Sequence, residues 1–345
     1  MSNKRATSFD VAREAGVSRT TVSFVLNNVT SISISDATRQ RVFAAAEKLN
    51  YHPDASGRKL VTGKSSTIGL VLRQSFDQIF SDAFLLQAML GIDHAASQYG
   101  FNLLLKPLDP NHHNGYDQLV SENHVDGIIL SGPRQDDSEI TKRFKDGFPI
   151  VLMGQLEGSE IPFVDINAYE GAADATRHLI ELGHRRIGMI TNASMQYTSA
   201  RQRRQGFVYA LKKANLSFDE SLFQEGDYTP ASGFSAMNKL LENKEIPTAV
   251  FVASDVVATG AIQAIKNHHL SIPQDISVIG FDDIPMAAYF DPPLTTIRLP
   301  AYEIGREAGE KLIQIIRKQD PQPYQELLNT KLIIRESTAQ RETLS

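Results

Sequence analysis

The chain has 345 residues, of which 41% are hydrophobic and 22% are charged, and its formal net charge is −5 at pH 7. This composition is typical of a soluble globular protein with room for two or three cores. The sequence contains no cysteine, which excludes disulfides, thiolate metal sites and cysteine nucleophiles. No stretch approaches the roughly 18 apolar residues of a membrane span, and the polar N-terminus lacks the core of a secretory signal. We therefore expect a cytoplasmic protein that does not contact a membrane.

Residues 7–28 predict two short helices joined by a tight turn at Gly16. Thr7 and Asp10 have the spacing of a capping box, which opens the first helix. Ser18 can accept backbone N–H bonds as the N-cap of the second helix. Both helix starts are therefore set by local side-chain chemistry.

The spacing of Ala12, Gly16 and Val22 is that of a helix-turn-helix, which places a small residue at the crossing, glycine at the turn and a branched residue on the second helix. The apolar face of the pair comprises Val11, Ala12, Ala15, Val22, Val25 and Leu26. The row expected to point outward comprises Arg19, Thr20, Ser23, Phe24 and Asn27. This outward row is the candidate DNA-reading surface.

A third helix is expected from Ser35 to about Asn50, ahead of Pro53, so that three helices form the unit. Its apolar residues that would close the small core are Val42, Ala46 and Leu49. Residues 1–64 carry a net charge of +5, whereas the remainder carries −10. A basic end favours attraction to phosphates, although a helical hairpin without a DNA partner remains the alternative, because moderate charge asymmetry is common.

From Thr67 onward, short apolar segments alternate with amphipathic helical patterns. The expected strands are TIGLVL, FNLLL, DGIIL, PIVLM, RIGMIT, TAVFVAS and ISVIGF. The expected helices include residues 84–99, 169–182, 198–214 and 255–268. This alternation predicts a doubly wound α/β architecture with parallel sheets covered on both faces. The strands form two groups either side of about residue 166, and residues 297–329 and 331 onward look like returns. We expect two lobes with a ligand between them.

Several patterns that suggest other chemistry are incomplete. The pairs His112–His113 and His268–His269 lack further ligands at a useful spacing, so we expect no metal site. Asp282 and Asp283 are adjacent carboxylates without a nucleophile or second acid. Neither GxGxxG nor GxxxxGK[ST] is present, so no cofactor is indicated. We expect a protein without catalytic activity, and the competing classes are an α/β enzyme or a sugar-binding receptor with a fused helix-turn-helix.

The chain resembles transcriptional regulators of the LacI/GalR family over nearly its whole length. The resemblance rests on the segments DVAREAGVSRTTVSFVLN, TRQRVFAAAEKLNYHPDASGRKL, DGIIL, LIELGHRRIG, RRQGF, DISVIGFDDI, PPLTTIR and LIIREST. It implies a homodimeric repressor that binds a pseudo-palindromic double-stranded operator and senses a small molecule in a core similar to type I periplasmic binding proteins. Because no leucine heptads follow LIIREST, we expect a dimer rather than a coiled-coil tetramer.

The resemblance also implies a division into domains. The helix-turn-helix headpiece would cover residues 1–52, and a hinge helix with its linker would cover residues 53–65. The core that binds the effector and forms the dimer would cover residues 66–345. Within the core, one lobe would comprise about 66–165 with 297–329, and the other about 166–296 with 330–345.

The resemblance places major-groove contacts at the start of the second helix, on Arg19 and Thr20. It positions four further side chains for phosphates: Thr7, Thr21, Ser23 and Asn27. Many relatives have arginine where this chain has Phe24. An aromatic ring can touch a thymine methyl but cannot hydrogen-bond a base. Packing of Phe24 against the headpiece itself is the alternative.

Residues 53–60 correspond to the hinge helix of the family, which forms in the dimer on DNA and inserts a leucine into the minor groove. Leu60 is the candidate wedge, and Arg58 lies in register with the motif. Seven or eight residues are too few for a stable isolated helix, and Gly57 weakens it further. Ordering should therefore depend on DNA and the partner chain. An ordinary exposed linker leucine is the alternative.

The strongest candidates for effector binding are Arg203 and Asp282, because a guanidinium can donate to one sugar hydroxyl and a carboxylate can accept from its neighbour. An aromatic side chain such as Phe84 can cover the apolar face of a pyranose. Asp82, Asn167 and Ser254 match cleft positions of the family, and Arg134 in SGPRQDD resembles a subset of family members that sense sugars or glycosides. The alternatives are an ion pair for Arg203 and Asp282, and core packing for Phe84. We expect a sugar or glycoside as effector; the alternative functions are a corepressor-dependent regulator that senses a nucleobase or other metabolite, and a sugar receptor without control of DNA.

Overall fold

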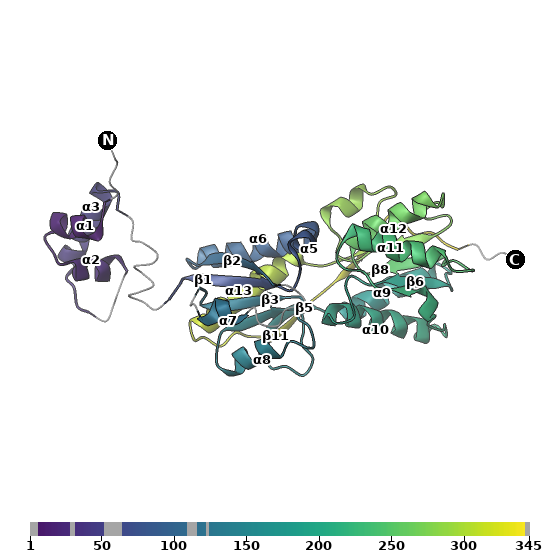
Figure 1. Cartoon of the computed structure of the whole chain (residues 1–345), viewed down its shortest axis with the longest axis horizontal. Coiled ribbons are helices and arrows are strands. Elements are labelled where there is room, and N and C mark those ends of the chain that lie inside the picture. The colour runs from purple at the N-terminus through teal and green to yellow at the C-terminus, as the bar shows by residue number, and fades with distance from the viewer. Residues whose placement is uncertain (1–5, 28–31, 52–63, 109–115, 122–123, 342–345) are drawn as a thin grey trace. The chain divides into compact units, whose positions relative to one another are not determined.

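The computed structural model describes residues 6–27, 32–51, 64–108, 116–121 and 124–341 (Figure 1). It divides into two units, of which the first comprises residues 1–66 with 121–126 and the second comprises residues 67–120 with 127–345. Among the described helices, none combines the length and apolar character needed to cross a membrane.

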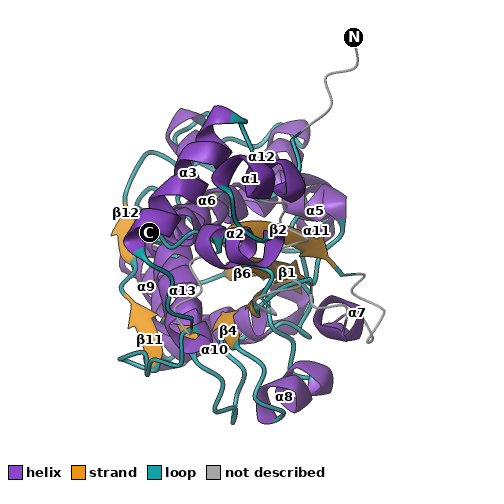
Figure 2. Cartoon of the chain, turned by 90° about the vertical axis from the view of Figure 1, so that its left-hand side faces the viewer, coloured by secondary structure: helices purple, strands orange, loops and turns teal. Residues whose placement is uncertain are grey.

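The first unit contains three helices that pack against one another (Figure 2). They are α1 (Ser8–Ala15), α2 (Arg19–Leu26) and α3 (Asp36–Lys48). The predicted capping box is present, since the backbone N–H of Thr7 donates to Oδ2 of Asp10 at 3.0 Å and Asp10 N–H donates to Oγ1 of Thr7 at 3.4 Å. Gly16 adopts the left-handed conformation at φ +66°, which a glycine adopts without strain. The backbone N–H of Thr21 donates to Oγ of Ser18 at 3.1 Å, which confirms the second predicted cap.

Eight buried side chains form the core of this unit, and they come from all three helices: Val11, Ala12, Ala15, Val22, Val25, Val42, Ala45 and Ala46. Leu26 and Leu49 are only partly buried and pack against this core. The predicted third helix is confirmed, with Ser35 as its N-cap and Leu49 as its C-cap. The three helices thus form one small apolar core.

The second unit contains two lobes, each built on a parallel sheet (Figure 1). In the N-lobe the strand order is β11-β5-β4-β3-β1-β2. These strands are β1 (Thr67–Leu72), β2 (Asn102–Pro107), β3 (Gly127–Ser131), β4 (Ile150–Met153), β5 (Phe163–Ile166) and β11 (Gln325–Leu328). The helices of this lobe are α5 (Phe76–Ser81), α6 (Ala83–Gln98), α7 (Tyr116–Ser121), α8 (Ser138–Lys145) and α13 (Ala301–Ile316). Every paired strand in this sheet is parallel, as the apolar runs predict.

The C-lobe has a four-stranded parallel sheet in the order β7-β6-β8-β9. Its strands are β6 (Ile187–Ile190), β7 (Phe223–Gln224), β8 (Ala249–Val252) and β9 (Ser277–Ile279). Its helices are α9 (Ala168–Glu181), α10 (Thr198–Lys213), α11 (Pro230–Leu241) and α12 (Asp255–Asn267), with short 3-10 turns η1 (Glu220–Leu222) and η2 (Pro285–Tyr289). Figure 1 shows α11 and α12 on one side of this sheet, and α9 and α10 on the other. The doubly wound α/β architecture is confirmed.

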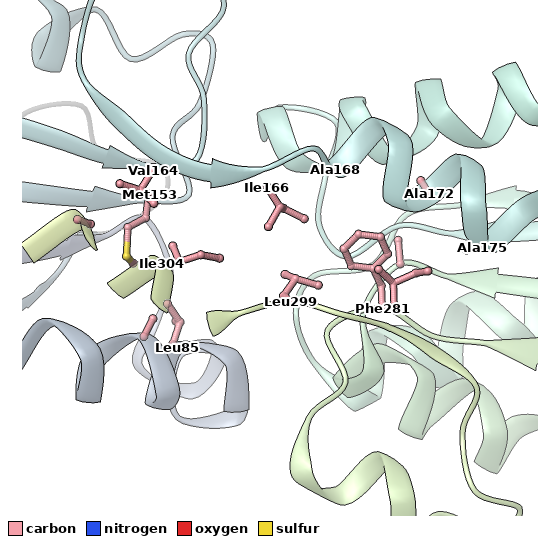
Figure 3. Close-up of a cluster of buried hydrophobic side chains, with 14 of the residues drawn as sticks. Leu85, Met153, Val164, Ile166, Ala168, Ala172, Ala175, Phe281, Leu299 and Ile304 are labelled. Atoms are coloured by element: carbon pink, nitrogen blue, oxygen red, sulfur yellow. The ribbon is translucent and has the colours of Figure 1, made fainter. Parts of the chain in front are cut away.

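The described chain crosses between the lobes three times. It leaves the N-lobe after β5 at residues 166–168, returns at residues 298–301 and leaves again at residues 328–331. The last crossing ends in β12 (Lys331–Ile333), which pairs antiparallel with β10 (Thr296–Arg298) in the C-lobe. Figure 3 shows Ile166 and Leu299 on two of these crossing segments, with apolar side chains of both lobes on either side. The crossing segments therefore contribute buried apolar side chains to the core that joins the two lobes.

Candidate functional site

A cavity of about 80 Å³ lies between the two lobes of the second unit. Its walls include Gln74, Ser131 and Ile304 from the N-lobe and Asn192, Ser254 and Asp282 from the C-lobe. Most of its polar side chains follow the carboxyl ends of parallel strands, where open α/β sheets bind ligands. An engineered cavity that admits benzene measures about 150 Å³, so a ligand larger than a few water molecules requires the lobes to separate or side chains to move.

Arg203 on α10 is 7% exposed and lies in the wall of the cavity. Its guanidinium group stacks 4.1 Å from the centroid of the Phe281 ring. Its Nη1 donates to the backbone oxygen of Ala253, and its Nη2 lies 3.7 Å from Oδ1 of Asp282. These contacts position the guanidinium group and leave its buried Nε–H without a hydrogen-bond partner among the described residues.

Three carboxylates share the lining of this cavity. Asp82 is the N-cap of α6, and its Oδ1 accepts from the backbone N–H of Phe84 at 3.0 Å. Burial raises the pKa of Asp82 to about 6 and the pKa of Asp165 to about 6. Burial also raises the pKa of Asp282 to about 7, although the neighbouring Arg203 opposes this increase. The cavity therefore contains carboxyl groups that titrate near neutral pH.

Five of the seven side chains expected at the effector site line this one cavity: Asp82, Phe84, Arg203, Ser254 and Asp282. The other two, Arg134 and Asn167, do not line it. Asn167 is exposed and its side-chain oxygen accepts from the backbone N–H of Glu170 at 3.1 Å as the N-cap of α9. Arg134 lies against the Tyr197 ring and pairs with Asp136 at 2.8 Å.

The sequence did not predict several residues that line the cavity, among them Gln74, Asp165, Asn192, Ser199 and Tyr228. Gln74 and Asn192 each follow the last residue of a strand by two positions, after β1 and β6. The rule that ligands bind beyond the carboxyl ends of strands was therefore a signal that could have identified these two. Tyr228 lies in the segment between β7 and α11, which has no such signal.

Hydrogen bonds join the two lobes around the cavity. The hydroxyl of Tyr197, at the start of α10, donates to the backbone oxygen of Arg73 in the N-lobe. The hydroxyl of Thr198 donates to the backbone oxygen of Pro133 at 3.3 Å. A third bond joins Nε2 of Gln78 to the backbone oxygen of Asp227 at 2.9 Å. We call these three bonds the lobe contacts; they hold the lobes together in this conformation.

The candidate reading surface of the first unit is only partly as expected. Arg19 and Thr20 are exposed at the start of α2. Ser23, Phe24 and Asn27 are half-buried rather than fully outward, because α2 packs on both other helices. Asn27 caps α2 and its amide donates to the hydroxyl of Ser23 at 3.2 Å.

Two of the expected phosphate contacts use their hydroxyls within the unit. The hydroxyl of Thr7 donates to Oδ2 of Asp10 at 2.7 Å. The hydroxyl of Thr21 lies 2.9 Å from the hydroxyl of Ser18. The hinge candidates Arg58 and Leu60 lie outside the described residues.

No group of three or more histidine, aspartate or glutamate side chains in the described part of the chain is arranged to hold a metal ion. The pair His112–His113 lies outside that part. His268 and His269 are exposed, and Nε2 of His268 lies 2.9 Å from the side-chain oxygen of Asn238.

Comparisons with known proteins match both units. A model of bacterial regulatory proteins of the lacI family matches residues 9–54, and a model of the periplasmic binding protein-like domain matches residues 176–338. The chain is 34% identical to the HTH-type transcriptional regulator CelR of Thermobifida fusca over 341 residues, which is 97% of this chain and 98% of the relative. It is also 34% identical to the HTH-type transcriptional repressor PurR of Haemophilus influenzae strain PittEE over 339 residues, covering 96% of this chain and 98% of the relative.

Two solved structures extend these similarities. A complex of the transcriptional regulator CelR with cellobiose has a TM-score of 0.74 at 32% identity, covering 96% of this chain and all of that one. A lac repressor dimer bound to operator and the anti-inducer ONPF has a TM-score of 0.83 at 28% identity, covering 97% of this chain and all of that one.

Proposed function

This chain belongs to the LacI family of bacterial regulatory proteins, and we propose that it is a transcriptional repressor whose affinity for its operator is set by a sugar bound between the lobes. The protein acts as a homodimer on pseudo-palindromic DNA. It works in the cytoplasm, where its operator is, and it performs no catalytic step.

The observation that supports a sugar effector most strongly is the placement of Arg203 beside Asp282 in the cavity wall. The free Nε–H can donate to a sugar hydroxyl, and the carboxylate can accept from the next hydroxyl along the ring. Phe84 lines the same cavity and offers an apolar surface to the ring face. The solved complex of the related CelR contains cellobiose, which supports the same class of ligand here.

The DNA contacts follow from the exposed start of α2. Arg19 and Thr20 read base edges in the major groove, since both are exposed there and are not used in the core. Thr7, Thr21, Ser23 and Asn27 contact phosphates, for which the hydroxyls of Thr7 and Thr21 exchange their partners Asp10 and Ser18 for phosphate oxygens. Phe24 meets a thymine methyl. Arg58 and Leu60 act in the hinge, with Leu60 as the minor-groove wedge.

Control of DNA affinity depends on lobe closure. The lobe contacts of Tyr197 and Thr198 form only when the lobes approach each other. A ligand that touches both walls of the cavity stabilises the closed arrangement relative to the open one. Residues 53–65 join the headpiece to the N-lobe in the sequence, so a change in the arrangement of the lobes is passed to DNA binding through this segment. Operator affinity then changes with effector occupancy.

The test combines a ligand screen with an operator assay on the full-length protein. We expect thermal shifts with monosaccharides or disaccharides such as cellobiose, and calorimetry should then show loss of affinity in Arg203→Met. The matched control is Arg204→Met on the same helix, because Arg204 pairs with Glu220 at 2.8 Å and does not line the cavity. A response to purine bases alone would replace the sugar by a nucleobase. Equal sugar affinity in both variants would remove Arg203 from the site.

A further inference from the structure

The cavity between the lobes is acidic. Three carboxylates line it, from Asp82, Asp165 and Asp282, whereas Arg203 is the one cationic side chain among its described lining residues. The side chains of Arg203 and Asp282 are both less than 10% exposed, at 9% and 8%. Uncompensated negative charge in a poorly solvated cavity repels an anionic ligand and attracts a cationic one.

Arg203 offsets only part of this charge, because a single guanidinium faces three carboxylates. One face lies on the Phe281 ring, Nη1 donates to the backbone oxygen of Ala253, and Nη2 faces Asp282. Its Nε has no hydrogen-bond partner among the described residues. A phosphate or carboxylate that approached Arg203 would also face the carboxylates of Asp82 and Asp165.

Beside the carboxylates, the cavity wall contains a buried side-chain oxygen that lacks a hydrogen-bond donor. Asn192 is 2% exposed, its amide nitrogen donates to the hydroxyl of Ser199 at 3.2 Å, and its buried Oδ1 has no partner within the described residues. A buried acceptor without a partner costs free energy that a ligand donor can recover. The aromatic rings of Phe84 and Tyr228 also line the cavity, and ring faces attract cations.

We propose that the effector carries a positively charged amino group and is therefore an amino sugar or a similarly hydroxylated amine. This inference rests on the proposed function and specifies the chemical class of its ligand. An ammonium group supplies three donors and no acceptor, which matches the carboxylates and the Asn192 oxygen. The ring hydroxyls remain for Arg203 Nε and the hydroxyl-bearing side chains of the lining.

The affinity of the cavity for an amine should also depend on pH, because several titratable groups surround it. Asp82 comes from the N-lobe, Asp165 from the end of β5, and Arg203 and Asp282 from the C-lobe. The fully buried Asp255 interacts electrostatically with Asp282. Burial raises the pKa of Asp82, Asp165 and Asp282 to about 6, 6 and 7. These carboxylates take up protons between pH 7 and pH 5.5, so affinity for an ammonium group falls over that range.

The decisive experiment is calorimetry of the full-length dimer with matched pairs of saccharides at pH 7. The pairs are glucosamine with glucose, and the β-1,4-linked glucosamine disaccharide with cellobiose, so that each pair differs by amino groups in place of hydroxyls. N-acetylglucosamine and glucose 6-phosphate supply an uncharged amide and an anion. We expect the amine of at least one pair to bind about tenfold more tightly than its neutral parent, because charge-assisted hydrogen bonds are roughly twice as strong as neutral ones. We also expect this advantage to shrink at pH 5.5.

The matched variants are Asp82→Asn and Asp77→Asn. Asparagine at position 82 keeps an oxygen that can cap α6 but removes the charge in the cavity, whereas Asp77 is an exposed residue of the preceding helix α5. Asp82→Asn should remove most of the amine preference, and Asp77→Asn should leave it unchanged. A neutral parent or glucose 6-phosphate that binds as tightly as the amine would overturn this inference and leave the sugar-controlled repressor intact. If no saccharide of any charge binds, the sugar effector of the proposed function fails as well.

Discussion

Replacing Tyr197 with phenylalanine tests whether closure of the lobes is part of effector binding. Tyr197 is 6% exposed, and its hydroxyl donates to the backbone oxygen of Arg73 in the N-lobe. The ring itself packs edge-on against Tyr228, with centroids 5.5 Å apart. Phenylalanine keeps this packing and removes only the hydroxyl, so the change acts on one bond between the lobes.

The expected size follows from that single bond. A neutral hydrogen bond of this kind contributes about 1 kcal/mol net, and this contribution exists only in the closed arrangement. A penalty of about 1 kcal/mol corresponds to about a fivefold change in an equilibrium constant. The dissociation constant of the effector should therefore rise by about fivefold, whereas the free energy of unfolding of each lobe should change little.

Two assays measure this effect. Calorimetry gives the effector affinity, and spin labels on cysteines introduced at Lys145 and Ser235 report the separation of the lobes. Both positions are exposed, and the natural chain has no cysteine to interfere. At a concentration of effector that half-saturates the natural protein, the distance distribution of Tyr197→Phe should lie further toward the open arrangement.

The control is Tyr289→Phe, because Tyr289 is 79% exposed on η2 and takes no part in the lobe contacts. It should leave both the affinity and the distances unchanged. If Tyr197→Phe bound effector as tightly as the natural protein and gave the same distances, the lobe contacts would play no part in closure.

Three further outcomes are expected. Arg19→Ala should reduce discrimination at one operator position by about 1–3 kcal/mol in gel-shift series with substituted bases, whereas equal weakening on every sequence would make Arg19 a phosphate contact. Gly206→Ala should destabilise the C-lobe by about 1–3 kcal/mol in urea unfolding, because an added Cβ would lie 2.0 Å from the backbone oxygen of Tyr169. An unchanged midpoint of urea unfolding would show that α9 and α10 can separate freely. Arg73→Met should destabilise the N-lobe by about 3–5 kcal/mol, because it removes the partner 2.9 Å from the buried Asp137, and a thermal transition equal to that of the natural protein would contradict this.

Much of the fold could be predicted because its signals are local. The caps at Thr7 and Ser18 depend on side chains within three residues of the helices they start. The apolar strands of both lobes are continuous runs that no other arrangement buries as well. The strand β5 was not predicted, because its four residues include Asp165 and lack a continuous apolar run.

The candidate site was less accessible to sequence analysis, because its lining depends on how the two lobes meet. Asn167 was expected in the cavity, but its oxygen is needed by the first turn of α9. Arg134 was expected there too, but its guanidinium forms a salt bridge with Asp136, two residues along the chain. Asp165 and Tyr228 reach the cavity only through tertiary packing, which no local spacing specifies.

The most direct test of the account is to measure operator affinity by fluorescence anisotropy, with and without a bound effector, over a range of salt concentrations. We expect a salt-sensitive preference for one inverted-repeat sequence, a change in affinity of about 5–150-fold on effector binding, and an equal change in effector affinity when operator is added. Binding that shows no preference for any inverted repeat, or an operator affinity that no small molecule changes, would contradict the account.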